Sequence, residues 1–181
     1  MPARLNRALQ VRTADRLRAS LARDDRTGLP LVAALSDADQ RELREVGGGR
    51  LVAIVFRVEW LTGATVHPGA IAEIESVVMR RAAQRVDEHV RRTDLLGSLS
   101  EAALVILAPA LDPASGRSLA ERLSVVFAGL HVQVGELQVQ LRVGVGVASR
   151  DAASPHGWTV QTLAEEAERT ASDLPPIAIV A

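Results

Sequence analysis

The chain has 181 residues, of which 48% are hydrophobic, and its formal net charge is −1. This length fits one compact domain with room for a sheet covered by helices, and the charge provides no general attraction to nucleic acid or to a membrane surface. The sequence has no cysteine, which excludes disulfides, thiolate zinc sites and cysteine nucleophiles. Because there are only two Trp, two Phe and no Tyr, a nucleic-acid platform of stacked aromatic rings is not expected.

No apolar run approaches the roughly 20 residues that a membrane-spanning helix needs. The first residues carry Arg at positions 4, 7, 12 and 16 and have no continuous apolar segment, so they do not resemble a secretory signal. We therefore expect a cytoplasmic protein, with no nucleic-acid or membrane partner.

Residues 3–23 have the composition of a helix, with no internal Gly or Pro and with an apolar stripe of leucines. The stripe consists of Leu5, Leu9, Leu17 and Leu21. Two interpretations remain open: a helix packed on its own domain, or a short helix for self-association that would make the protein a homodimer. We divide the chain into this N-terminal helix, residues 1–23, and one domain, residues 24–181.

A turn is expected after this helix because Gly28 and Pro30 stand close together in Asp24-Asp25-Arg26-Thr27-Gly28-Leu29-Pro30. Residues 31–46 are predicted as a helix, with Ser36-Asp37 as a possible break or cap. Gly47-Gly48-Gly49 is predicted as a loop, since a phosphate-binding loop would follow a strand rather than precede one. Residues 51–56 form an almost continuous apolar run, typical of a strand buried on both faces, which continues to Leu61.

A clear amphipathic helix is predicted for residues 70–90, after a turn at His67-Pro68-Gly69. Arg91-x-x-Asp94 follows, and then two short apolar runs, residues 95–99 and 102–107, which a polar Ser100-Glu101 tip joins. This arrangement is the signature of a β-hairpin.

The sequence of the remaining residues, 109–181, predicts alternating turns, helices and strands. We expect a turn at residues 109–115, a helix ending near Gly129, an antiparallel pair at 131–134 and 137–148, and a last helix at 158–173. The apolar segment Ile177–Val180 would add an edge strand or pack on the core. From the residues alone the fold class is α/β, with one sheet and about five helices.

Three patterns in this order and spacing resemble the GGDEF family, the diguanylate cyclase domain. They are Asp24-x-x-Thr27-Gly28-Leu29-Pro30, Arg91-x-x-Asp94, and Ser100-Glu101-Ala102-Ala103-Leu104 at the signature position of the hairpin. The resemblance covers roughly residues 24–173. It implies a nucleotide-cyclase-like fold, related to the ferredoxin-like palm, with a central, mostly antiparallel, five-stranded sheet covered by helices.

The same resemblance implies that catalysis has been lost. The family's two acidic positions at the end of the first strand fall on Arg57 and Glu59, and a guanidinium repels the magnesium ion that the first of these positions should hold. The two guanine-reading positions fall on Thr65 and Ile74. The signature residues 100–104 lack both the glycines and the acidic pair. We therefore expect no enzyme activity, no catalytic residue, no metal and no cofactor.

Two functions remain open. In the first, the domain is a protein-interaction or signalling module with an unknown protein partner. In the alternative, it is a receptor for cyclic di-GMP, because Arg91 and Asp94 stand where the family has its inhibitory dinucleotide site: Arg91 would bind a phosphate or a guanine edge, and Asp94 would accept from guanine nitrogens. The same two side chains could instead form a solvated ion pair at a helix end.

Overall fold

In the part of the chain that the structure describes, five strands form a single sheet in the order β2-β3-β1-β5-β4, and every pairing between them is antiparallel. The computed structural model describes residues 2–127, 129–151, 154 and 157–173. The strands are β1 (Leu51–Leu61), β2 (Leu95–Ser100), β3 (Ala103–Pro109), β4 (His131–Val134) and β5 (Leu137–Arg150). The predicted five-stranded sheet is confirmed.

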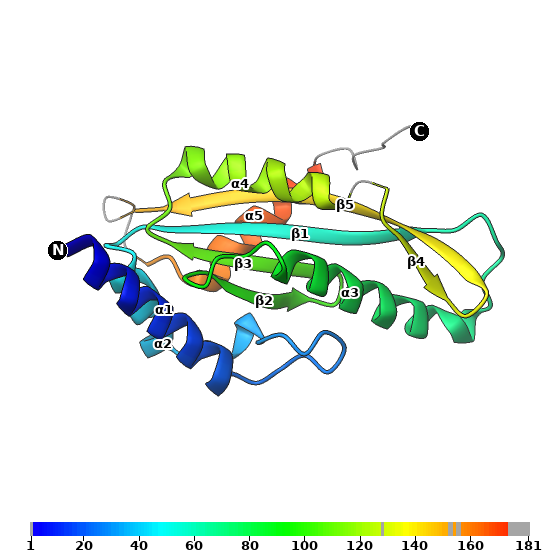
Figure 1. The fold of residues 1–181 in the computed structure, drawn as a ribbon, viewed down its shortest axis with the longest axis horizontal. Coiled ribbons are helices and arrows are strands. Elements are labelled where there is room, and N and C mark those ends of the chain that lie inside the picture. Colours follow the sequence, from blue (N-terminus) through cyan, green and yellow to red (C-terminus); the bar gives the residue numbers. More distant parts are fainter. Residues whose placement is uncertain (1, 128, 152–153, 155–156, 174–181) are drawn as a thin grey trace.

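Among the described residues, five α-helices cover the two faces of this sheet (Figure 1). They are α1 (Pro2–Ser20), α2 (Asp37–Val46), α3 (Ile71–Asp87), α4 (Pro113–Val126) and α5 (Val160–Asp173), with short 3-10 turns at Val32–Ala34 and Pro68–Ala70. One core cluster lies between the sheet and helices α3 and α4, and a second lies between the sheet and helices α1, α2 and α5.

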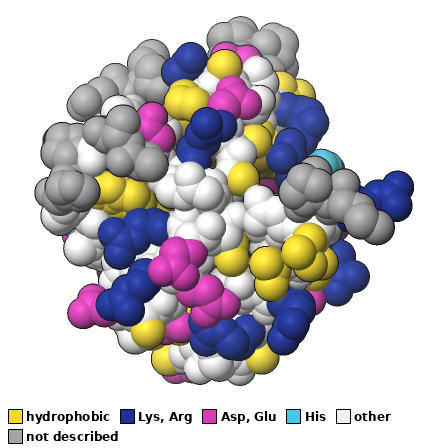
Figure 2. Space-filling model, turned by 90° about the vertical axis from the view of Figure 1, so that its left-hand side faces the viewer, with side chains coloured by type: hydrophobic (Ala, Val, Ile, Leu, Met, Phe, Trp, Pro, Cys, Tyr) yellow, Lys and Arg dark blue, Asp and Glu magenta, His cyan; other side chains and the backbone are white. Residues whose placement is uncertain are grey.

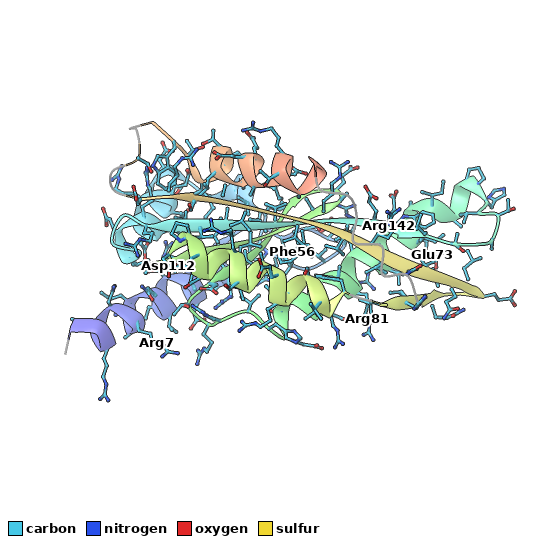
Figure 3. The ribbon with its side chains drawn as sticks, turned by 90° about the horizontal axis from the view of Figure 1, so that it is seen from above. Arg7, Phe56, Glu73, Arg81, Asp112 and Arg142 are labelled. Atoms are coloured by element: carbon cyan, nitrogen blue, oxygen red, sulfur yellow. The ribbon has the colours of Figure 1, made fainter. Side chains whose placement is uncertain are left out.

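β1 contributes side chains to both core clusters, because successive side chains of a strand point to opposite faces of the sheet. Val52, Ile54 and Phe56 belong to the first cluster, whereas Leu51, Ala53 and Val55 belong to the second. All six are fully buried, as the continuous apolar run predicted. The ring of Phe56 lies in the interior (Figure 3), with its centroid 5.8 Å from that of Phe127.

The predicted helix at residues 31–46 is divided at Ser36. Its first part is a 3-10 turn, and α2 begins at Asp37 with a capping box in which Ser36 and Asp39 each accept a hydrogen bond from the other's backbone N–H. The expected turn at 109–115 is shorter than predicted, because Asp112 caps α4, which starts at Pro113. The segment Ile177–Val180 lies outside the described residues. Among the described helices, none combines the length and the hydrophobicity that crossing a membrane requires.

The predicted tip of the hairpin is wrong by one residue. Ser100 is still in β2 and pairs with Ala103, so the turn consists of Glu101 and Ala102. The register shifts between Ser98 and Ser100, which places an extra residue in β2 before the turn. Such a bulge cannot be seen in the apolar pattern, which marks the runs and not their pairing.

The C-terminal half of α1 packs on the domain. Leu17 and Leu21 are buried in the second cluster, Thr13 Oγ1 donates to Glu42 Oε1 of α2 at 2.6 Å, and Leu5 and Leu9 near the N-terminus stay exposed. Self-association through the exposed half remains a prediction. Positive and negative side chains alternate over the end of the molecule seen in Figure 2, with hydrophobic side chains in small groups between them.

α5 lies unusually close to β5, because two positions of β5 have no side chain. A Cβ atom on Gly144 would lie 2.5 Å from the carbonyl oxygen of Ala171, and one on Gly146 would lie 1.9 Å from that of Ala167. At its N-terminal end α5 is joined to α2 by a hydrogen bond, which Val160 N donates to Gln40 Oε1 at 2.9 Å.

Candidate functional site at the hairpin and the 91–94 loop

The turn after α1 is built around the carboxylate of Asp24. Its Oδ2 accepts hydrogen bonds from Thr27 Oγ1 at 2.9 Å and from Ser98 Oγ of β2 at 3.1 Å, and its Oδ1 accepts from the backbone N–H of Arg26 at 3.2 Å. Gly28 completes the turn with a positive φ of 72°. Although burial alone would raise the pKa of Asp24, the hydrogen bonds from Thr27, Arg26 and Ser98 lower it below its ordinary value. The sequence motif at residues 24–30 is therefore a structural turn, which a hydrogen bond between Asp24 and Ser98 joins to β2.

A pocket of about 380 Å³ lies between the end of β1, helix α3 and the hairpin turn. Its lining consists of Val58, Glu59, Trp60, Glu75, Val78, Met79, Glu101 and Ala102. Three glutamates from three elements thus line one pocket, and no lining residue is basic. Sequence reasoning missed Glu75. This residue follows the buried Ile74 on α3 and is itself exposed, and the packing of α3 beside β1 places it at the pocket.

The other positions that the resemblance assigned to nucleotide or metal are dispersed. Arg57 does not line this pocket. It is exposed and pairs across the sheet with Ala103 of β3 and Gly144 of β5; by strand alternation its side chain leaves the sheet on the same face as that of Glu59. Thr65 lies in an exposed loop. Ile74 is 1% exposed and belongs to the first core cluster, so its side chain faces the protein interior.

Arg91 and Asp94 lie in one tight turn but in different surroundings. The N–H of Asp94 donates to the carbonyl of Arg91 at 3.0 Å, yet Arg91 is exposed while Asp94 is only 2% exposed. Asp94 Oδ1 accepts from Thr93 Oγ1 at 3.0 Å, and its Oδ2 has no hydrogen-bond partner among the described residues. Burial raises the pKa of Asp94 above its ordinary value, against the opposing effects of Thr93 and Arg91. With Asp94 buried, the two side chains do not form a solvated ion pair.

Helix α1 covers this turn. The guanidinium of Arg18 donates to the carbonyl oxygens of Asp94 and Arg92, the latter at 3.2 Å. Asp15, one helical turn earlier, pairs with Arg18 at 2.8 Å and with Arg92 at 3.2 Å. The 91–94 loop is therefore held by a residue more than 70 positions earlier in the chain, an arrangement that the four-residue pattern could not reveal.

Comparison with known proteins identifies the architecture. No family model and no curated protein matches the sequence, but solved structures do. The GGDEF domain of FimX from Pseudomonas aeruginosa superposes with a TM-score of 0.65 over 83% of this chain and 91% of its own, at 16% identity. The chain has the fold of a GGDEF domain.

Two further GGDEF structures carry partners in their crystals. The diguanylate cyclase SiaD of Pseudomonas aeruginosa, in complex with its activator SiaC, is 20% identical, with a TM-score of 0.61 over 95% of this chain and 64% of SiaD. The GGDEF domain of DgcB from Caulobacter crescentus, in complex with c-di-GMP, is 14% identical, with a TM-score of 0.60 over 83% of this chain and 85% of its own. The fold expected from the three motifs is thereby confirmed.

The residues at the corresponding end of this GGDEF fold do not fit a magnesium ion. Magnesium requires hard oxygen ligands in a tight octahedron, whereas Arg57 brings a positive charge and Ala102 and Ala103 bring no side-chain ligand atom. Among the residues that the structure describes, no three His, Asp or Glu side chains are grouped closely enough to hold a metal.

Proposed function

We propose that the chain is a catalytically inactive GGDEF-like domain that acts as a protein-interaction module in signalling. The observation that carries this proposal is the pocket at the hairpin, which Glu59, Glu75 and Glu101 line without any basic residue. A nucleoside triphosphate is a polyanion, and proteins bind its phosphates through arginine, lysine or a bound metal. Two like unit charges 4 Å apart repel by about 4 kcal/mol at an effective dielectric constant of about 20, so this pocket disfavours GTP.

A role in protein binding is supported by features that need no nucleotide. α1 leaves Leu5 and Leu9 67% and 44% exposed on one side of the helix, while its other half is fixed to the domain. SiaD, which shares the fold, was crystallised with an activator protein. We infer that the retained fold presents surfaces to a protein partner.

The first test is turnover. The full chain is incubated with GTP and magnesium, and products are separated by chromatography beside an active diguanylate cyclase as positive control. We expect no cyclic di-GMP. Magnesium-dependent synthesis above the no-protein control would refute the proposed inactivity.

A second candidate function is reception of cyclic di-GMP at Arg91. It is favoured by the exposure of Arg91 and by the c-di-GMP complex of DgcB. Because Asp94 is buried, in a turn whose backbone carbonyls accept hydrogen bonds from Arg18, its carboxylate would have to become accessible before it could accept from a guanine.

Calorimetric titration of cyclic di-GMP into the full chain separates the two functions. Arg91→Ala is the test variant, and Arg122→Ala, which removes another exposed arginine from α4, is the matched control. Micromolar or tighter binding that only Arg91→Ala abolishes would establish the receptor. Absence of binding in all three proteins leaves the interaction module, for which partner binding should be unaffected by Arg91→Ala.

A further inference from the structure

One long edge of the sheet is unpaired in the part of the chain that the structure describes. β5 has 14 residues and pairs with β1 over residues 140–150, but β4 pairs only with residues 137–140. Residues 142–150 therefore have no strand on their second side among the described residues. Figure 3 shows β5 toward the viewer, with α5 on one side of it and α4 on the other. A long free edge exposes backbone donors and acceptors, and proteins usually cover it.

A groove of about 340 Å³ runs along this edge between the two helices. Its floor is formed by residues 143–147 of β5, its walls by Ala120 and Ser124 of α4 and by Thr170 of α5, and its lining is mostly apolar. Arg117 and Glu121 stand at its α4 side. An unpaired strand with an apolar floor has the features that bind an added β-strand: the backbone pairs, and alternate side chains fill the groove.

Helix α5 brings the following segment of the chain to this groove. Its Ala171 carbonyl lies against Gly144, its Thr170 lines the groove, and the helix ends at Asp173. The sequence then continues Leu-Pro-Pro-Ile-Ala-Ile-Val-Ala. Two prolines cannot continue a helix, and Ile-Ala-Ile-Val has strong strand propensity.

The distances permit the segment to reach the edge. The four residues that lead from Asp173 to Ile177 span up to about 14 Å when extended, whereas a paired strand would lie about 4.8 Å from β5. An extended segment of four residues is about 13 Å long, comparable with the part of β5 that forms the groove floor. Its two isoleucines, at positions 177 and 179, would share one face.

We propose that the chain's own segment Ile177–Val180 binds the free edge of β5 as an added strand and places Ile177 and Ile179 in the groove between α4 and α5. This docking closes the sheet edge against strands of other molecules. It is independent of nucleotide binding and of the 91–94 loop.

The test is amide hydrogen exchange of β5 by NMR in the full chain. In an edge strand every second N–H points away from β1, so residues 143–147 contain both outward amides and inward amides that serve as internal references. We expect the outward amides to be protected in the parent. In the double variant Ile177→Ser/Ile179→Ser they should exchange at least about tenfold faster, while the inward amides keep their rates.

Two control variants and one further test variant complete the experiment. Ala178→Ser adds a hydroxyl to the opposite face of the segment and should leave the exchange unchanged. Ser124→Trp fills the groove from α4 and should expose the same outward amides, whereas Val125→Trp, at a neighbouring 70% exposed position, should not.

The proposal is overturned if the outward amides of the parent exchange as fast as those of unstructured peptides, or if the double serine variant leaves them protected. Protection that increases with protein concentration and survives the double variant would instead assign the edge to a second copy of the chain.

Discussion

The close contact between α5 and β5 gives the sharpest stability prediction. In Gly146→Ala, the new Cβ atom would lie 1.9 Å from the carbonyl oxygen of Ala167, 2.4 Å from Thr170 Oγ1 and 2.5 Å from the N atom of Ala171. Two of these three atoms are helix backbone, so a side-chain rotation cannot relieve the clash and α5 must move away from the sheet. Overpacking a well-packed interior typically costs about 1–3 kcal/mol, and we expect the upper end of this range.

For a chain of this size, 1 kcal/mol corresponds to about 2–4 °C in Tm, so Gly146→Ala should lower Tm by about 6–12 °C. Thermal unfolding followed by circular dichroism, together with urea unfolding, measures the effect. The matched control is Gly63→Ala, where a Cβ atom meets nothing within 4 Å; this variant should stay within about 0.5 kcal/mol of the parent. A Gly146→Ala protein as stable as the control would refute the close packing of α5.

Three further predictions concern the 91–94 loop and the turn around Asp24 that follows α1. Burial raises the pKa of Asp94, so its ionised form destabilises the fold above the folded pKa, and this cost disappears as pH falls toward 3.8. In urea unfolding, the variant Asp94→Asn should therefore be more stable than the parent at pH 7 and as stable as the parent at the acid end. A loss of stability at pH 7 would contradict this. Arg18→Ala removes two hydrogen bonds to loop carbonyls and should cost about 1–2 kcal/mol, against no measurable change for the exposed Arg12→Ala. Ser98→Ala removes a hydrogen bond to the buried Asp24 carboxylate and should cost about 1.5–3 kcal/mol at pH 7; because the pKa of Asp24 is lowered, this cost should diminish as pH falls through the folded pKa.

The elements of the sheet could be predicted because their signals are local. The run Leu51–Phe56 is apolar at every position, and a strand buried on both faces requires this. The break at Ser36 was visible because a capping box needs only Ser36 and Asp39 three residues apart. The hairpin turn was displaced by one residue because a bulge in β2 depends on the pairing partner, which a single strand does not encode.

The surroundings of the candidate site could not be predicted, since they depend on contacts between distant segments. Arg91-x-x-Asp94 gives no sign that Asp94 is buried, or that Arg18 of α1 donates hydrogen bonds to the backbone of its turn. Glu75 and Glu101 reach one pocket only after α3 has packed beside the hairpin. The free edge had a signal that sequence reasoning left unused: the predicted strand at 131–134 is much shorter than its neighbour at 137–148, so it can pair with only part of the longer strand.

The placement of the two tryptophans makes the protein its own optical reporter. The chain has no tyrosine, so its emission above 300 nm comes from Trp60, which lines the acidic pocket, and from Trp158, whose ring lies 5.2 Å from the guanidinium carbon of Arg44 on the other face of the sheet. Replacing Trp158 with phenylalanine would leave a single fluorophore in the pocket. Occupation of that pocket by any ligand or partner would then shift or quench the remaining emission, and binding could be followed in solution without an attached label.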